Sequence, residues 1–292
     1  MSAVTASLDA RDTAHIESIT DYTIPTHEVL ATVVVTTAAA DRDLFTTVLD
    51  ALDSQTETAY DVIVVDRGTG WNLSALLATT RRVRLAVRVT NDTGPVLARN
   101  IGARLATGPL LIFLDDDAIP TARFVEAHLR AHRVNNIVAA RGRVLPHTSH
   151  LYNATQPAYN LGSMQFPTYL DLVGNVSFDR DTFYSLGGFD HRTTGMAALD
   201  WTARALAAGI SREELIYYPE AVTSHDYATD FWSYIHRRRQ DATVAGTAPH
   251  FSAVVAEYDD RPAAEQPPLA RRDRLKLRLL TSLAAPLITR PT

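Results

Sequence analysis

The chain has 292 residues, of which 46% are hydrophobic and 21% charged, and its formal net charge is −5. This length suits one large α/β domain or one domain with appendages, and the acidic balance provides no basic field for nucleic-acid binding. The chain has no Cys, which excludes disulfides and Cys-ligated zinc. No apolar run reaches the roughly 18 residues of a membrane-spanning helix, and the polar start lacks a signal-peptide core. We therefore expect a cytoplasmic protein.

The first half of the chain alternates strands with helices. Residues 1–30 are polar and weakly periodic, so we treat them as an N-terminal extension that packs as an early strand or helix. Ala31–Thr37 is rich in β-branched residues and is predicted to be the first core strand. A helix, a strand, a helix and a strand are predicted next, over Arg42–Asp53, Asp61–Asp66, Leu73–Thr80 and Val83–Thr90. This order indicates βαβ units and a Rossmann-like, mainly parallel sheet flanked by helices.

The most informative stretch is a buried strand that ends in three carboxylates. The strand Leu110–Leu114 follows the predicted helix Pro95–Ala106 and leads directly into Asp115, Asp116 and Asp117. Ligands of open α/β sheets bind outside the carboxyl ends of the strands. Because alternate residues of an extended segment share a face, Asp115 and Asp117 can hold one Mg²⁺ or Mn²⁺ ion together with a diphosphate. The alternative is a solvated acidic loop that caps the helix starting near Thr121.

The second half of the chain is predicted to contain a long loop between regular elements. Pro146–Pro167 is loop-like and long for a connection inside a compact domain, which is typical of binding loops and lids. Strands are predicted at Ile137–Val144, Leu172–Phe178 and Leu215–Tyr218. Helices are predicted at Asp181–Leu186, Asp200–Ala208 and Phe231–Ala242. Asp200 and Arg204 have the i, i+4 spacing of a helical ion pair, and Pro219 is expected to end its strand.

Residues 247–292 are predicted to form a linker and a basic amphipathic helix. Asp259–Pro268 is rich in Pro, Ala and charge, and Leu269–Ile288 sets basic residues among leucines. Such a helix suits peripheral contact with an anionic membrane surface, here the cytoplasmic face, through residues 269–292. Packing back onto the domain, or an oligomer contact, is equally compatible with the pattern.

Four motifs occur in a characteristic order. Val62–Thr69 contains a strand that ends on Asp66, and Gly94 to Gly102 contains Ala-Arg-Asn. Phe113 to Pro120 contains the three aspartates, and Gly174 to Asp190 contains Gly-Asn-Val-Ser-Phe and Leu-Gly-Gly-Phe-Asp. Together these motifs resemble those of the family-2 glycosyltransferases, which have a GT-A fold and use nucleotide-sugar donors. The resemblance implies a GT-A domain over 31–246 and sugar transfer to a hydroxyl, with inversion at the anomeric carbon.

The resemblance also implies roles for individual residues. Those implied to bind the nucleotide sugar are Thr36, Asp66, Arg67, Arg99, Asn100, Asp115 and Asp116. Those implied to bind Mn²⁺ or Mg²⁺ are Asp115, Asp117 and His225, and those on the acceptor side are Tyr159, Gly174 and Asn175. The implied partners are a nucleotide-diphosphate sugar and a glycan, lipid-linked or protein acceptor.

Several of these residues have an ordinary structural alternative. Asp66 precedes Gly-x-Gly, where an aspartate commonly caps a turn, and Arg67 stands where the family has a second aspartate. Arg99 could form an ion pair on a helix surface, and His225 could be structural. The Arg237–Arg239 run either steers phosphates or forms a solvated helix face.

One departure from the family concerns the general base. The family usually places Gly-x-Glu-Asp-x-Asp at the start of a helix, whereas this chain has Ala197 and Ala198 at the first two acidic positions and retains only Asp200. The other candidates are Asp190 and His191. We expect slow transfer from this sequence, and a gain of roughly 10²–10⁴ from Ala197→Glu with Ala198→Asp.

Two rival functions follow from the same residues. One is a catalytically silent protein that binds a nucleotide sugar, which the two alanines favour. The other is a nucleotidyltransferase, which would need a Gly/Lys-rich phosphate loop after the first strand; Thr36–Ala40 offers none.

Overall fold

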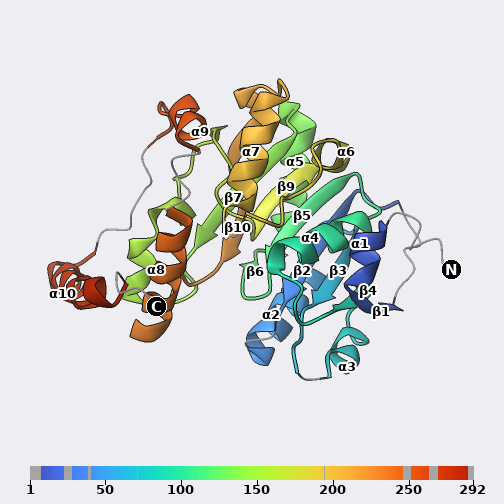
Figure 1. Cartoon of the computed structure of the whole chain (residues 1–292), viewed down its shortest axis with the longest axis horizontal. Coiled ribbons are helices and arrows are strands. Elements are labelled where there is room, and N and C mark those ends of the chain that lie inside the picture. Colours follow the sequence, from blue (N-terminus) through green and yellow to red (C-terminus); the bar gives the residue numbers. More distant parts are fainter. Residues whose placement is uncertain are drawn as a thin grey trace.

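The protein is an α/β sandwich built on one ten-stranded, mostly parallel sheet (Figure 1). This computed structural model describes residues 8–22, 28–38, 41–70, 72–193, 195–245, 251–262 and 269–288. The strand order is β1-β4-β3-β2-β5-β9-β7-β10-β6, and β8 pairs with β10. The predicted α/β class and the mainly parallel, helix-flanked sheet are confirmed.

The amino-terminal half of the sheet is parallel. Strands β4 (Val83–Val89), β3 (Tyr60–Asp66), β2 (Ala31–Thr37) and β5 (Leu110–Asp115) run side by side in one direction. Their side chains are almost all buried, because helices cover both faces. The predicted first strand is confirmed residue for residue.

The carboxyl-terminal half of the sheet is mixed. Strand β9 (Asn175–Asp179) is antiparallel to both β5 and β7 (Ala139–Leu145), and β7 is parallel to β10 (Leu215–Ser224). Two-residue strands β6 (Ile119–Pro120) and β8 (Phe166–Pro167) pair antiparallel with β10. Because β6 pairs with β10, the segment that follows the three aspartates lies beside β10, at the opposite end of the strand order from β1.

Helices cover the sheet in two layers. One face packs against α2 (Arg42–Asp53), α3 (Leu73–Leu77) and α5 (Phe124–Asn135). The other packs against α4 (Pro95–Arg104), α6 (Arg180–Ser185) and α7 (Ala197–Ala207). Helix α2 shows why these elements form: Asp41 caps its first turn through the amides of Asp43 and Leu44, and its apolar stripe is buried.

The N-terminal extension is part of the fold. Helix α1 (Ala10–Ala14) leads into β1 (Ile16–Asp21), which pairs antiparallel with β4 at the edge of the sheet. Within the long segment 146–167, the structure places the short 3₁₀ helices η2 (Leu151–Thr155) and η3 (Pro157–Tyr159) as well as β8. Another 3₁₀ helix, η4 (Arg212–Glu214), precedes β10.

Several sequence-based boundaries differ from the structure: α3, β9 and α7 each begin or end a few residues from the predicted limits, and β10 is longer than predicted. Pro219 does not end its strand: β10 continues to Ser224, and a register shift between Tyr217 and Val222 accommodates the proline. Helix α9 (Ser252–Glu257) precedes the predicted linker stretch Asp259–Pro268, and α9 and the following Tyr258 pack against Tyr169 and Leu199. Residues 263–268 of that linker lie outside the described part.

The carboxyl-terminal helices lie at the end of the molecule far from α1 and β1 (Figure 1). Helix α8 (Phe231–Ala245) packs against α10 (Arg271–Ile288), which confirms a helix over the predicted basic stretch. Among the described helices, none is both long and apolar enough to cross a membrane.

Candidate active site

The candidate site lies at the carboxyl edge of the parallel strands. Thr37 of β2 is in register with Asp66 of β3, and Thr36 of β2 with Asp115 of β5. Parallel strands end at one edge, so the polar residues that end each of them are brought together. Strand pairing between β6 and β10 then brings the residues after Asp115 toward His225.

Asp115 is held between a cation and a glycine. The Arg99 guanidinium of α4 lies with Nη2 2.6 Å from Asp115 Oδ1. A Cβ on Gly174 would lie 1.9 Å from Asp115 Oδ2, so a side chain there would displace the carboxylate. Arg99 therefore pairs with the aspartate motif itself rather than with a surface residue.

Asp117 is paired with two residues from the far side of the sheet. Its Oδ1 lies 3.1 Å from Nε2 of His225, which follows β10, and its Oδ2 lies 3.6 Å from Nη2 of Arg237 on α8. Burial raises the pKa of the Asp117 carboxyl, but the hydrogen bond with His225 and the charges of His225 and Arg237 outweigh it. The pKa is lowered, so Asp117 is an anion at neutral pH.

Asp116 lies between these two residues in a different environment. Burial raises the pKa of its carboxyl to about 6; the Thr37 hydrogen bond opposes this rise, and the charges of Asp117 and Asp115 add to it. Burial and the nearby Arg99 lower the pKa of Arg67, whereas Asp116 raises it. Arg67 Nε donates to the Thr93 carbonyl at 3.0 Å, which fixes the guanidinium near the aspartates.

Asp66 has the turn-capping contacts that its sequence context favours. Its Oδ1 accepts hydrogen bonds from the amides of Gly68 and Thr69, both at 2.9 Å, and its Oδ2 pairs with Arg88 at 2.5 Å. Gly68 has φ +108, a conformation that glycine adopts readily. Asp66 and Thr36 are both buried, so a role in nucleoside binding stays a prediction for both.

A cavity of about 210 Å³ joins the aspartates to the acceptor-side motif. Its wall includes Asp115, Gly174, Tyr159, His225 and Arg237, among other residues. The rings of Tyr159 and His225 lie 5.6 Å apart. A second cavity, of about 340 Å³, shares His225 and Arg237 and includes Asp117. Six of the sequence-predicted residues thus line these two cavities: Asp115, Asp117, His225, Tyr159, Gly174 and Asn175. Thr36, Asp66, Arg67, Arg99, Asn100 and Asp116 are not among the lining residues of either cavity.

The comparisons with known proteins agree with this geometry. The model of the family described as Glycosyl transferase family 2 matches residues 32–190, more than half of the chain. The chain belongs to this family. It is therefore a glycosyltransferase.

Individual relatives are distant. A glucosyl-dolichyl phosphate glucuronosyltransferase of Haloferax volcanii is 24% identical over 225 residues, which cover 68% of this chain and 71% of the relative. The solved structure of mannosyltransferase PcManGT from Pyrobaculum calidifontis, in complex with GDP-Man and Mn²⁺, aligns with a TM-score of 0.59 at 19% identity. That alignment covers 95% of this chain and 78% of the other. S. aureus TarS 1–349 aligns with a TM-score of 0.52 at 13% identity, over 79% and 71%. These two structures establish a shared GT-A fold.

The side chains of two residues predicted to bind ligands, Asn100 and Asn175, form hydrogen bonds within the glycosyltransferase itself. The Asn100 side chain exchanges two hydrogen bonds with the backbone of Phe189, at 2.7 and 3.0 Å. Asn175 is fully buried, with its amide nitrogen near the Arg143 and Ala221 carbonyls and its oxygen 3.1 Å from His128 Nε2. Both amides tie elements of the fold together, which leaves them little capacity for a ligand.

The two positions at which the family usually has acidic residues, Ala197 and Ala198, are packed into the core. Helix α7 begins at Ala197, ahead of the predicted start at Asp200, and Ala197 and Ala198 are 3% and 2% exposed within a large hydrophobic cluster. Asp200 forms the predicted ion pair with Arg204, at 2.9 Å. Arg204 also donates to the Gly188 carbonyl at 2.8 Å, so Asp200 belongs to a structural network.

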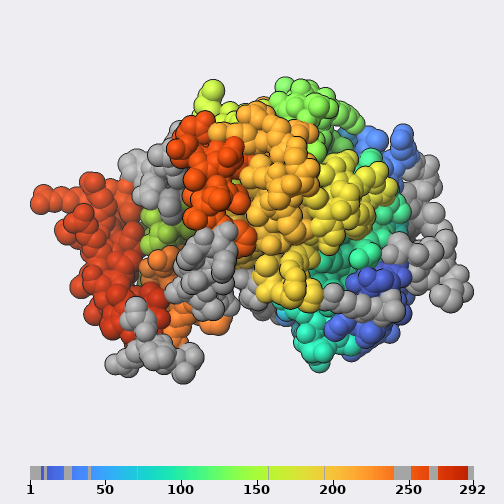
Figure 2. All heavy atoms as spheres, turned by 45° about the horizontal axis from the view of Figure 1, so that its top comes forward, coloured from blue at the N-terminus to red at the C-terminus, as the bar shows by residue number. Residues whose placement is uncertain are grey.

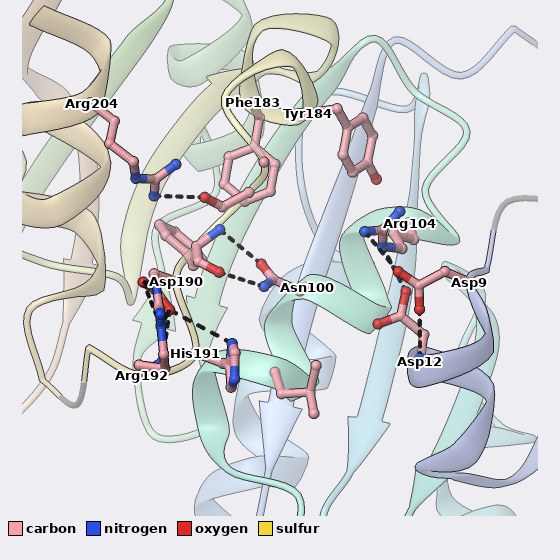
Figure 3. A pocket seen from close by; sticks show the side chains of 14 residues that line it. Asp9, Asp12, Asn100, Arg104, Phe183, Tyr184, Asp190, His191, Arg192 and Arg204 are labelled. Atoms are coloured by element: carbon pink, nitrogen blue, oxygen red, sulfur yellow. Dashed lines mark hydrogen bonds and ion pairs between the residues drawn. The ribbon is translucent and has the colours of Figure 1, made fainter. Parts of the chain in front are cut away.

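Asp190 and His191 line a different cavity, of about 460 Å³, between α4, α6 and α1 (Figure 3). Asp190 pairs with Arg192 at 2.7 Å, and this hydrogen bond lowers the pKa of Asp190 to about 2, although burial opposes the shift. Across this cavity Arg104 pairs with Asp12 at 2.6 Å (Figure 3). The described residues that line it do not include any of the three aspartates of the 115–117 motif.

Sequence reasoning missed a carboxylate, Asp171, that lines the cavity of about 210 Å³. Asp171 contributes to its wall and pairs with Arg141 of β7. A signal existed: Arg141 and Arg143 fall within the predicted strand Ile137–Val144, which has no other charged residue, and a buried arginine needs an anionic partner. The arginines of the Arg237–Arg239 run have different partners. Arg237 pairs with Asp117, whereas Arg239 Nε donates to the Leu287 carbonyl at 2.9 Å.

The donor set is compatible with a hard divalent cation. Among the described residues there is no cluster of three or more His, Asp, Glu or Cys side chains that would hold a metal by itself. Mg²⁺ and Mn²⁺, however, commonly use one or two protein ligands and fill the remaining positions with water and substrate phosphates. Asp117, ionised and adjacent to the His225 nitrogen, meets that requirement.

Proposed function

We propose that this glycosyltransferase moves a sugar from a nucleotide-diphosphate donor to a hydroxyl acceptor, in a Mn²⁺- or Mg²⁺-dependent reaction with inversion. The observation that carries the proposal is the meeting of Asp115, Asp117, His225 and Arg237 at the carboxyl edge of a family-2 sheet. The structural neighbour in complex with GDP-Man and Mn²⁺ supports the same chemistry.

In this proposal, one group of residues binds the cation and the diphosphate, and another binds the nucleoside. Asp117 and His225 hold the cation, which when bound supplies positive charge to the departing diphosphate. Arg99 lies beside Asp115 and Arg237 beside Asp117, and both guanidinium groups add fixed positive charge. Asp66 and Arg67 lie farther along the strand edge, on the side where the nucleoside is expected.

The acceptor is proposed to be lipid-linked. The Haloferax relative is named for a glucosyl-dolichyl phosphate substrate, and α10 presents a face suited to lipid. Ala284 of α10 is buried and Leu280 and Leu287 pack inward, whereas Leu275, Leu279 and Leu283 are more than half exposed. In Figure 2 this helix, in red, projects at one end of the molecule.

The exposed leucine stripe is flanked by five cations. Arg271, Arg272, Arg274, Lys276 and Arg278 lie in the first turns of α10, beside a single carboxylate, Asp273. Leucines at i, i+4 and i+8 share one helix face, and cations around such a face favour an anionic bilayer surface. We propose that α10 rests on the cytoplasmic face of a membrane, with one side of the helix packed against the protein and the exposed leucine side against lipid.

The first experiment screens nucleotide sugars. Melting temperatures are measured with UDP-, GDP- and dTDP-sugars in Mn²⁺ and in EDTA, followed by transfer assays with glycosyl lipid acceptors and NMR of the product anomer. A Mn²⁺-dependent rise in melting temperature and an inverted product are expected. If no nucleotide sugar raises it, the proposed function is wrong; binding without turnover would instead support the silent-protein alternative that the alanine pair favours.

The second experiment is co-sedimentation with vesicles. The triple variant Leu275→Ser, Leu279→Ser, Leu283→Ser is expected to lose binding to phosphatidylglycerol-containing vesicles. The matched control, Val134→Ser, removes an exposed apolar residue of α5 and is expected to bind normally. Equal binding by the triple variant and the control would contradict the membrane proposal, and dimers that the triple variant disrupts would assign the stripe to a second copy.

A further inference from the structure

Two carboxylates among the described residues, Asp115 and Asp171, line the cavity of about 210 Å³. Asp115 is held by Arg99 and belongs with the donor residues. Asp171 lies in the segment between β8 and β9, three residues before Gly174, the residue that contacts Asp115. A carboxylate outside the donor cluster therefore shares a cavity with that cluster.

Asp171 is positioned from behind by a buried cation. Its Oδ1 accepts a hydrogen bond from Nη1 of Arg141, whose side chain is fully buried, while the Asp171 side chain is 18% exposed. The Arg141 guanidinium also donates to the Ala158 carbonyl and lies 5.8 Å from the centroid of the Tyr217 ring. In the described part of the chain, Asp171 Oδ2 has no recorded hydrogen bond. Arg141 thus fixes one oxygen, and the described residues leave the other without a hydrogen bond in a side chain that lines the cavity.

The other carboxylates that could act as the general base are paired with cations. Asp200 pairs with Arg204, and Asp190 pairs with Arg192 beside a different cavity. Asp117 is paired with His225 and Arg237. Tyr159 and Tyr227 also line the cavity, but a neutral hydroxyl oxygen is a much poorer proton acceptor than a carboxylate.

We propose that Asp171 is the general base of this glycosyltransferase, taking the role of the acid that is missing at Ala197 and Ala198. This proposal rests on the proposed function. The acceptor oxygen forms a bond to the anomeric carbon as the bond from that carbon to the diphosphate oxygen breaks. The electron pair of that bond leaves with the diphosphate, and the hydroxyl proton passes to the Asp171 carboxylate.

The test compares Asp171→Asn with Asp200→Asn in transfer assays. Asp171→Asn is expected to lower kcat by roughly 10²–10⁴, the usual effect of a positioned general base, with an unchanged Kd for the donor. It should also abolish the acidic limb of the pH profile of kcat, which a purely structural role would leave in place. A larger loss of kcat in Asp200→Asn, or an acidic limb retained in Asp171→Asn, would overturn the proposal.

A second variant separates chemistry from folding. Asp171→Asn leaves the Arg141 charge buried without its partner, so the double variant Asp171→Asn, Arg141→Met removes both charges together. It is expected to melt at a higher temperature than Asp171→Asn and to remain equally slow; recovery of kcat in the double variant would show that Asp171 acts only through stability. If wild type binds no nucleotide sugar, the proposed function fails, whereas normal transfer by Asp171→Asn refutes only the base.

Discussion

His225 Nε2 lies 3.1 Å from Asp117 Oδ1, although two strands, β9 and β7, separate β5 from β10 in the sheet. The contact exists because β6, which follows Asp117 closely, pairs with the end of β10, which immediately precedes His225. The hydrogen bond and the charge of His225 oppose the effect of burial on the pKa of Asp117 and keep this carboxylate ionised.

This relationship predicts a metal-dependent effect of Asp117→Asn. Removing the charge should weaken nucleoside-diphosphate binding at least tenfold in Mn²⁺, because an amide is a poorer ligand for a hard cation. In EDTA the variant and the wild type should bind alike. Titration calorimetry under both conditions measures this, and equal affinities with and without metal for the wild type would contradict the metal site.

Gly174→Ala should weaken donor binding through Asp115. A Cβ 1.9 Å from Asp115 Oδ2 must push the carboxylate away from its position against Arg99. We expect a loss of about tenfold in donor affinity, or ~1.4 kcal/mol, with a smaller effect on the melting temperature. Unchanged affinity, measured by the same calorimetry, would show that the position of Asp115 does not matter to the donor.

Restoring the family's acids is expected to destabilise the protein. The sequence alone predicts faster transfer from Ala197→Glu with Ala198→Asp, but both methyl groups lie in the hydrophobic core. Burying two carboxylates without partners costs several kcal/mol. Urea unfolding should therefore show a large loss, with no gain in transfer, and Ala207→Glu on the exposed part of α7 serves as the control. A stable double variant with faster transfer would restore the original prediction.

Two buried histidines predict acid sensitivity. Burial lowers the pKa of His128 to about 3 and that of His132 to about 4, and both rings lie 2.9 Å from the Ser177 hydroxyl oxygen. Because the unfolded chain takes up these protons near pH 6.5 and the folded chain does not, stability is complete above pH 6.5 and falls as the pH drops toward 4. Each histidine contributes a slope of up to about 1.4 kcal/mol per pH unit.

Urea unfolding at pH 7.5 and pH 5.0 measures this slope. His128→Gln removes one titrating group and should lose less stability than the wild type over that interval. His150→Gln, at an exposed position, should show the wild-type loss. A His128→Gln slope equal to that of the wild type would mean that the ring is not neutral in the folded protein.

The sequence by itself determined the elements whose signals are local. Ala31–Thr37 and Leu110–Asp115 are strands because β-branched and apolar runs suit a sheet buried on both faces, and Asp41 and Pro95 begin helices through short-range chemistry. The order of four motifs was enough to indicate the family. The Asp200–Arg204 pair also follows from spacing alone, and the structure contains it.

Only the tertiary structure decided what each polar residue does. The partners of Asp117, Asn175 and Asp171 come from strands, helices and loops distant in the sequence, and no periodicity specifies which of them meet. Ala197 and Ala198 look like missing catalytic acids in a motif and prove to be core residues, because the packing of α7 on the sheet buries that side of the helix. Burial and long-range pairing set the charge and freedom of a side chain, and these depend on the whole fold.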